Sequence, residues 1–486
     1  MQSKIILFKD SFLRSVLLLF LVLSCSLHAQ DEFENNIIVS KFNEYSKTPR
    51  EIAFAHLNKS VYIKGETVAF KVYVFDKYDK GLSKLTKNLY WTISDLQGKI
   101  LKKEMILVKD GVAHASFFAD EQFTSGNYIF KTYTNWMKNF NEQNYYIQNI
   151  KIIDPDVEPT IISKVISPKL DAQFLPEGGH MVANIANTIG VILKDSLGFG
   201  VPFVTYSLEN ENNEILSTNK TNAYGIGKLE FTPKTTENYH VKVDFNGIPQ
   251  HFLLPKGKAQ GINMSLKDVN NKVVIKFATN VQTLPYIKNK TYTLAIHNGE
   301  NLNVTKIRFA TSTDVIAIIK YDELSPGINV FTLFDEDNNP LLERLFFNYE
   351  GIKTLDTDTL VFEKEDDSLK ISIPVRNINL NDTNSFSVSV LPTGTKSYTP
   401  HQNILSSLYL QPFLKGQIED AQFYFTNIDR KKKFELDNLL ITQGWSSYDW
   451  NTLFNYPPIL RFDFETGVRF TANVNKSQTG HFMMHV

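Results

Sequence analysis

The feature that most constrains the fold is a regular alternation of apolar residues directly after a glycine turn. Following the turn at residues 64–66, every second position is apolar: Val68, Phe70, Val72 and Val74. Successive residues of a β-strand point to opposite sides, so a period of two places these side chains on one face. The intervening positions are partly polar. The segment is therefore predicted to be a sandwich strand, with one face in a core and the other near solvent.

The same organisation recurs along the chain. Short strand-like segments follow one another at about ten-residue spacing, and glycine turns separate them, for example at 95–98, 110–111 and 125–127. This spacing is typical of antiparallel sandwiches. From residue 402 the apolar period becomes helical. We predict a mainly β fold of tandem antiparallel immunoglobulin-like β-sandwiches, with a small helical insertion near the C-terminus.

A chain of 486 residues is long enough for several such units. Proline, glycine and acidic residues mark the predicted boundaries between them. The predicted segments are a signal peptide (1–29), a linker (30–50), a first sandwich (51–154), a second sandwich (160–256), a third sandwich (261–350), a sandwich with the helical insertion at about 402–455 (351–460), and the start of an incomplete β domain (461–486).

The N-terminal segment has the pattern of a secretory signal. Basic residues precede a short apolar run at 16–23, which is too short to span a bilayer comfortably. Two processing routes are open. Cleavage after Ala29 releases a soluble chain that begins at Gln30, whereas residues 22–25 resemble a lipobox in which Cys25 is the lipid attachment site. Either route predicts export to the periplasm, the outer membrane or the cell exterior.

Composition argues against several functional classes. The net charge is −1 and the basic run at 430–433 is isolated, which does not suit a nucleic-acid-binding surface. Cys25 is the single cysteine, so the folded part has no disulfide and no cysteine nucleophile. The acidic run 335–339 lacks the glycine and glutamate of a calcium loop and is predicted to be a hairpin turn. Neither a zinc-protease motif nor a serine-hydrolase elbow is present. No enzyme activity, metal or cofactor is predicted.

Aromatic clusters supply the candidate contact residues. Trp136 and Phe140 lie in a turn-like stretch after a predicted strand, so they are candidates for protein contact, because tryptophan and other large aromatic residues dominate binding hot spots. The cluster at 445–450 is predicted instead to be core between helix and sheet. The segment 177–180, Glu-Gly-Gly-His, is predicted to be a tight turn between domains.

Two sets of motifs resemble known families. Residues 61–68, with the later segments 110–113 and 125–128, resemble the macroglobulin-type domains of the alpha-macroglobulin superfamily over about residues 55–153. A longer similarity is to large envelope proteins of Gram-negative bacteria that carry such a domain near the N-terminus. The matching segments are Phe174–Gly179, Glu343–Phe347 and Leu436–Trp445 with Trp450.

The resemblance implies a non-enzymatic exported envelope protein that binds a protein partner, either a peptidase or an outer-membrane receptor component. Covalent trapping by a thioester is excluded, because the required cysteine is absent. Any inhibition would be peptidase-inhibitor-like without a covalent bond. The alternative is the N-terminal part of an outer-membrane protein associated with TonB-dependent receptors, and a third is a hydrolase on a sandwich scaffold. Membrane contact is expected only through a lipid on Cys25.

Overall fold

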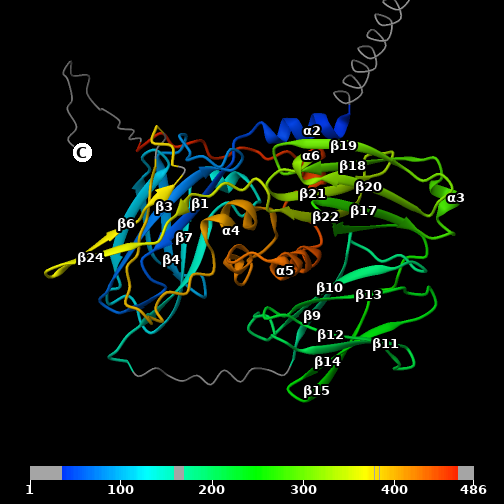
Figure 1. The fold of residues 1–486 in the computed structure, drawn as a ribbon, viewed down its shortest axis with the longest axis horizontal. Helices are drawn as coiled ribbons and strands as arrows, with labels where there is room; N and C mark the ends of the chain where they lie inside the picture. Colours follow the sequence, from blue (N-terminus) through cyan, green and yellow to red (C-terminus); the bar gives the residue numbers. More distant parts are fainter. Residues whose placement is uncertain (1–35, 158–168, 377, 382–383, 469–486) are drawn as a thin grey trace, which may run out of the picture.

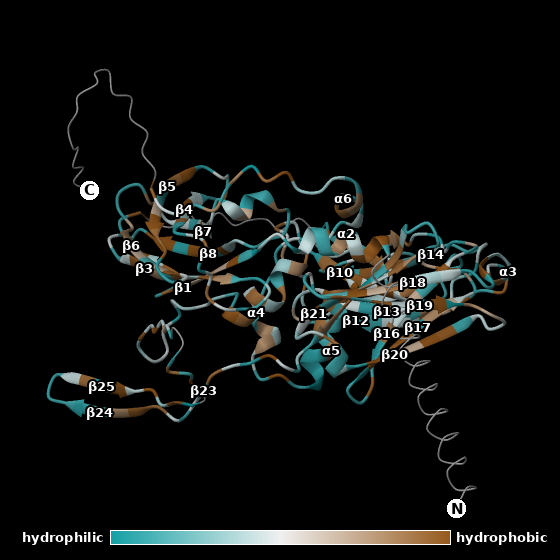
Figure 2. Ribbon diagram, turned by 90° about the horizontal axis from the view of Figure 1, so that it is seen from above, coloured by the Kyte–Doolittle hydropathy of each residue, from teal (hydrophilic) through white to brown (hydrophobic). Residues whose placement is uncertain are grey.

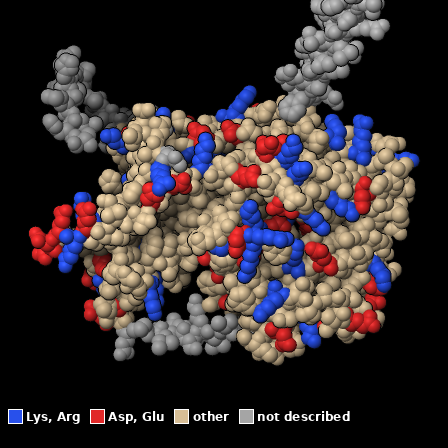
Figure 3. Space-filling view, in the orientation of Figure 1, with Lys and Arg blue, Asp and Glu red and all other residues tan. Residues whose placement is uncertain are grey.

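The computed structural model describes residues 36–157, 169–376, 378–381 and 384–468. Three β-sandwiches account for most of these residues, and a group of short helices lies between the first sandwich and the other two (Figure 1). The predicted fold class, tandem antiparallel sandwiches with a small helical part near the C-terminus, is confirmed. Charges of both signs are intermixed on the face drawn in Figure 3.

The first sandwich buries the alternating apolar residues that follow the glycine turn at 64–66. Val68, Phe70, Val72 and Val74 are all buried, and Phe70 packs edge-on against Trp91. One sheet has the order β1-β3-β6 and the other β2-β8-β7-β4-β5. The strands are β1 (Glu51–Leu57), β2 (Val61–Ile63), β3 (Thr67–Asp76), β4 (Asn88–Asp95), β5 (Ile100–Leu107), β6 (Val112–Phe118), β7 (Gly126–Tyr133) and β8 (Tyr146–Ile153), with the short helix η1 (Trp136–Asn139) before β8.

The second and third sandwiches repeat one plan, a three-stranded sheet facing a four-stranded sheet. In the second the orders are β13-β10-β9 and β12-β11-β14-β15. Its strands are β9 (Asp171–Pro176), β10 (Asn187–Lys194), β11 (Thr205–Asn210), β12 (Ile215–Lys220), β13 (Ile226–Phe231), β14 (Tyr239–Phe245) and β15 (Ile248–Leu253). Each sandwich has its own apolar core, which is what alternating strands on two facing sheets produce.

In the third sandwich the orders are β16-β17-β20 and β19-β18-β21-β22. The acidic run predicted to be a turn does connect β21 to β22, and the Asp335 carboxylate accepts hydrogen bonds from the backbone of Asp337 and Asn339. The elements are β16 (Ile262–Asp268), β17 (Lys272–Thr279), α3 (Leu284–Ile287), β18 (Thr291–His297), β19 (Leu302–Arg308), β20 (Asp314–Lys320), η2 (Tyr321–Glu323), β21 (Gly327–Phe334) and β22 (Pro340–Asn348).

The helices form a separate apolar core against the third sandwich. Helix α5 lies on β22 and also meets β10 and β13 of the second sandwich, while α2 packs on β19 and α6. Trp450 is buried here, as predicted for the aromatic cluster of this region. The elements are α2 (Ile37–Ser46), α4 (Ile404–Tyr409), η3 (Gln411–Phe413), η4 (Ala421–Phe425), α5 (Arg430–Ile441) and α6 (Trp450–Asn455). Among the described residues, no helix is both long and apolar enough to cross a bilayer.

Residues 351–398 differ from the predicted fourth sandwich. They form two small two-stranded sheets, and the hairpin β24-β25 projects from the body of the molecule (Figure 2). Within this range, residues 385–390 alternate between polar and apolar side chains but pair with no strand that the structure describes. The reason is that no second apolar layer faces them within the described part of the chain. The strands are β23 (Asp356–Thr357), β24 (Val361–Glu365), β25 (Ser368–Ser372) and β26 (Val375–Arg376).

Candidate functional site: a strap over the first sandwich

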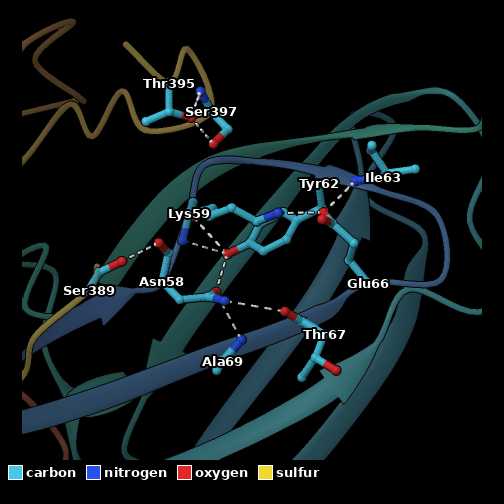
Figure 4. Close-up of polar contacts among 10 residues, drawn as sticks. All are labelled: Asn58, Lys59, Tyr62, Ile63, Glu66, Thr67, Ala69, Ser389, Thr395 and Ser397. Atoms are coloured by element: carbon cyan, nitrogen blue, oxygen red, sulfur yellow. Dashed lines mark hydrogen bonds and ion pairs between the residues drawn. The ribbon is translucent and has the colours of Figure 1, made fainter. Parts of the chain in front are cut away.

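The turn that joins β1 to β3 is held by a compact set of hydrogen bonds. The Tyr62 side chain is fully buried, and its hydroxyl lies 2.8 Å from Asn58 Oδ1 and 2.7 Å from the Lys59 carbonyl oxygen (Figure 4). The Glu66 carboxylate accepts bonds from the Ile63 backbone N–H and from Lys59 Nζ. The buried Tyr62 hydroxyl obtains its partners from Asn58 and Lys59. Glu66 of the Lys-Gly-Glu turn binds the Lys59 side chain, so the tyrosine and the turn hold the same segment.

A later segment of the chain is anchored on this turn. We call residues 385–398 the strap. The backbone N–H groups of Ser60 and Val61 both donate to the Ser397 carbonyl oxygen, at 2.8 and 3.0 Å. The Ser389 hydroxyl donates to the Asn58 carbonyl oxygen at 2.6 Å, and Figure 4 shows Ser389 and Ser397 beside the turn. The strap is therefore fixed at two points to the residues that open the first sandwich.

Just before Ser389, the strap crosses a row of basic side chains. His56 on β1 is paired with Lys71 on β3, and Lys71 is paired with His114 on β6, so the three lie side by side across the sheet. We call them the basic row. Ser387 Oγ lies 2.7 Å from His56 Nδ1, and Lys71 Nζ donates to the Phe386 carbonyl oxygen at 2.8 Å. Burial lowers the pKa of His56, which favours its neutral form at this contact.

The strap and the sheet border an open cavity of about 340 Å³. The basic row and the strap residues Ser387 and Ser389 line it, together with Asn58 and Ser116. None of its eleven lining residues is acidic. The volume falls within the usual range for small-ligand pockets, and the polar groups converge from four different segments of chain.

The side chains of the strap alternate, with polar residues facing the protein and apolar residues facing solvent. Its serines face the first sandwich, whereas Phe386, Val388 and Val390 are 52%, 63% and 68% exposed. The hairpin β24-β25 also exposes Phe362 and Leu369 on its surface. An isolated two-stranded hairpin is marginally stable in water, and a strand with an unpaired edge is a ready template for another chain. The strap and the hairpin each expose apolar side chains that no described residue covers.

The predicted contact residues Trp136 and Phe140 do not lie on the surface. They are 6% and 8% exposed, and the Trp136 ring stacks on Phe464 with ring centroids 4.0 Å apart. The Asn139 side chain also bonds to Phe462. The prediction of an exposed contact site is thus corrected: the chain returns more than 300 residues later and covers this turn. The predicted sites Cys25, Ala29 and Gln30 lie outside the described residues, so both processing routes stay predictions.

A buried ionic cluster joins the second and third sandwiches to α5. We call Glu177, Arg344 and Asp437 the tight cluster. Arg344 Nε lies 2.9 Å from Glu177 Oε1, and Arg344 Nη2 lies 2.5 Å from Asp437 Oδ1. The predicted turn at 177–180 thus contributes a structural carboxylate. The neighbouring Glu343 is buried without an ion pair among the described residues, and burial raises its pKa to about 7.

A second buried cluster lies where the first sandwich meets α2, β18 and the segment between α5 and α6. We call Arg50, Lys77 and Glu142 the loose cluster. Arg50 Nε and Lys77 Nζ lie 3.5 and 3.7 Å from Glu142 Oε1, longer than hydrogen bonds. Lys77 Nζ has no hydrogen-bond partner in the described structure, and neither do the nearby hydroxyls of Tyr78 and Tyr448. Burial lowers the pKa of Lys77 to about 8.

Both clusters are structural in their geometry. Glu142 and Glu177 are each less than 5% exposed and cannot meet a substrate from solvent, and the Asp437 side chain, 35% exposed, is bound by Arg344. Within the described ranges, no group of three or more histidine, cysteine, aspartate or glutamate side chains is placed to hold a metal ion. The strap and its cavity are therefore the accessible candidate site, and no functional role is predicted from the sequence for the residues that form it.

No family model matches the sequence, and no curated protein matches it. Solved structures do show similarity. Native alpha-2-macroglobulin of Escherichia coli is 10% identical with a TM-score of 0.19, covering 67% of this chain and 25% of that one. Latent PorU of Porphyromonas gingivalis is 11% identical with a TM-score of 0.27, covering 61% and 34%. A tandem repeat of a large adhesion protein is 12% identical with a TM-score of 0.17, covering 67% and 88%.

The chain thus spans about a quarter of the length of the alpha-2-macroglobulin structure. At these identities and TM-scores the similarity carries no argument about function. The proposals below rest on the contacts and charges of the strap instead.

Proposed function

We propose that this chain is a non-enzymatic exported protein of the bacterial cell envelope, in which tandem sandwiches form a scaffold that binds a partner protein. The partner class is a peptidase or an outer-membrane receptor component. Export is supported by the N-terminal signal pattern, and the scaffold role by the helices that pack on two sandwiches at once. The strap and the hairpin β24-β25 are the binding surface.

One observation carries this proposal. Phe386, Val388 and Val390 point to solvent from an extended segment that pairs with no described strand, while the serines between them face the protein. Apolar residues that alternate toward solvent lose the stabilisation of burial, about 25 cal/mol per Å². A partner that covers them recovers this stabilisation, and strand addition to an open edge is a common way of binding an extended segment.

Site-specific photo-crosslinking in cells that produce the protein tests the proposal. A photoreactive phenylalanine derivative replaces Val388 on the strap, Phe362 on the hairpin, or Ile316 on β20. Ile316 is the matched control, because it is also an apolar strand residue, 61% exposed, but lies on the third sandwich. We expect one protein adduct of the same mass from positions 388 and 362 and none from 316. Identical adducts from all three positions, or none from any, would contradict the proposal.

A further inference from the structure

The charge of the cavity under the strap points to the chemistry of its occupant. Lys71 and His114 face this space, and the lining contains no acidic residue to balance the charge of Lys71. Lys71 Nζ has one neutral acceptor, the Phe386 carbonyl, and forms no ion pair with any residue that the structure describes. A lysine that faces a cavity without a carboxylate favours an anionic ligand, because hydrogen bonds between ionised groups are shorter and stronger than neutral ones.

The spacing of the basic row fits a single carboxylate. Lys71 and His114 are directly opposed on the neighbouring strands β3 and β6, where Cβ atoms are typically about 5 Å apart. Both side chains can therefore reach the two oxygens of one carboxylate placed between them. Ser116 lies two residues along β6 on the same face and adds a hydroxyl donor. His56 is already engaged with Ser387, so its role is to hold the strap.

The surroundings of the cavity favour a peptide over a free acid. Val388 lines the cavity and is also 63% exposed, so the cavity opens beside the apolar outer face of the strap. An extended chain that pairs with the strap would place alternate side chains toward the strap's apolar residues and toward the sheet. We propose that this cavity binds the carboxylate of an aspartate or glutamate side chain carried by an extended segment of the partner protein. This inference rests on the proposed function.

Binding of short labelled peptides to the purified protein lacking residues 1–29 tests the inference. The probe is an acetylated fluorescein-labelled heptapeptide that alternates Thr and Val, with a central Glu; the comparison peptide has Gln at the same place. We expect the Glu peptide to bind roughly ten-fold more tightly by fluorescence anisotropy, as a charge-assisted bond implies. Equal affinities for the two peptides would overturn the inference.

Two variants locate the effect. Lys71→Met retains the apolar stem and removes the charge, and His114→Gln keeps a hydrogen-bonding side chain. Each should reduce the preference for Glu over Gln several-fold, and this preference is a ratio of two affinities measured on the same variant. Lys306→Met is the control, because Lys306 is an exposed lysine on β19 of the third sandwich. A preference for Glu that survives in both Lys71→Met and His114→Gln would overturn the assignment to the basic row.

A competition with free glutarate separates a peptide site from a site for small acids. Glutarate should displace the Glu peptide only at concentrations at least about a hundred-fold above the peptide dissociation constant, since it lacks the strand contacts. Displacement at equal concentration would assign the cavity to a free dicarboxylate and overturn the peptide part. If neither peptide binds but the crosslinks at 388 and 362 persist, the carboxylate inference fails while the proposed function stands.

Discussion

The tight cluster and the loose cluster both place charges in the interior, but the two are satisfied to different degrees. In the tight cluster, Arg344 makes short bonds to carboxylates from two other parts of the chain. In the loose cluster, both cations lie at 3.5 Å or more from one carboxylate, and several polar atoms lack hydrogen-bond partners among the described residues. The first arrangement recovers the cost of removing charges from water, and the second does so incompletely.

This difference indicates which parts of the molecule are fixed firmly to one another. Buried polar groups without partners cost free energy, whereas a fully bonded network fixes the geometry of the elements that contribute to it. The second sandwich, the third sandwich and α5 share the tight cluster and should behave as one body. The first sandwich meets that body through the loose cluster, so this junction should open at lower cost.

Removing Arg344 should have the largest effect on stability. Arg344→Met leaves Glu177 buried with no cation, and breaking a buried pair in this way costs about 3–5 kcal/mol. Urea unfolding of the variant and of the parent measures the loss. The matched control is Arg376→Met, because Arg376 pairs with Asp358 on the exposed surface, and such pairs contribute about 0–1 kcal/mol. Equal losses in the two variants would contradict the importance given to the tight cluster.

The second-largest effect on stability is expected from the raised pKa of Glu343. Its pKa is raised to about 7 in the folded protein, so between about pH 4.5 and 7 the native state holds a proton that the unfolded state has lost. The free energy of unfolding should therefore fall as the pH rises through this range, by roughly 2–4 kcal/mol.

Glu343→Gln should remove that pH dependence, since an amide can still accept from the Ser446 backbone N–H and does not titrate. Thermal unfolding of the variant and the parent at pH 5 and pH 7.5 checks the prediction. An unchanged difference between the two pH values in Glu343→Gln would assign the dependence to another group.

The loose cluster should respond less to mutation. Lys77→Met removes an amine that lacks a hydrogen-bond partner, and Glu142 keeps Arg50, so we expect a change of only about 1 kcal/mol in either direction. The lowered pKa of Lys77 also makes stability depend on pH in a defined direction. Between about pH 8 and 10.5 the unfolded state binds the proton that the folded state has lost, so stability contributed by this group rises with pH. In Lys77→Met this rise of stability with pH should be absent. A loss of stability as large as that caused by Arg344→Met would contradict the predicted difference between the two clusters.

The smallest effect concerns the strap. Ser387→Ala removes the bond to His56 and should cost about 0.5–1.5 kcal/mol, the usual value of one hydrogen bond. The readout is amide hydrogen exchange of Ser60 and Val61, whose N–H groups the strap covers. Ser385→Ala is the control, because the Ser385 hydroxyl bonds to no described residue. Faster exchange in both variants would show that the hydroxyl of Ser387 is not the anchor.

Local structure could largely be predicted from the sequence. The period-two pattern located β3 and its buried residues, and the glycine turns at 95–98 and 110–111 separated β4 from β5 and β5 from β6. The helical period at 404–409 and 436–440 placed α4 and α5. These features depend on neighbours in the chain, because strand and helix periods report which side chains share a face.

The strap and the clusters could not be predicted in this way. The segment Ser385–Val390 alternates cleanly, but a period of two defines two faces without saying which one meets solvent. The turn-like stretch around Trp136 predicts an exposed contact residue, but Phe464, more than 300 residues later, stacks on its ring. Arg344 finds Glu177 and Asp437 at separations of 167 and 93 residues. Contacts between residues so far apart in the sequence depend on how whole sandwiches are placed relative to one another. The periodicity of the sequence carries no information on that placement.

The long return of the chain to the first sandwich bears on the timing of folding during synthesis. His56 meets Ser387 across 331 residues, and Tyr90 meets Glu465 across 375. At a ribosomal rate of about 5–20 residues per second, the earlier partner of the first pair waits roughly 15 to 65 seconds for the later one. Throughout that interval the nascent first sandwich leaves its polar face and the Trp136 ring without their later cover, which makes it a natural client for a holding chaperone.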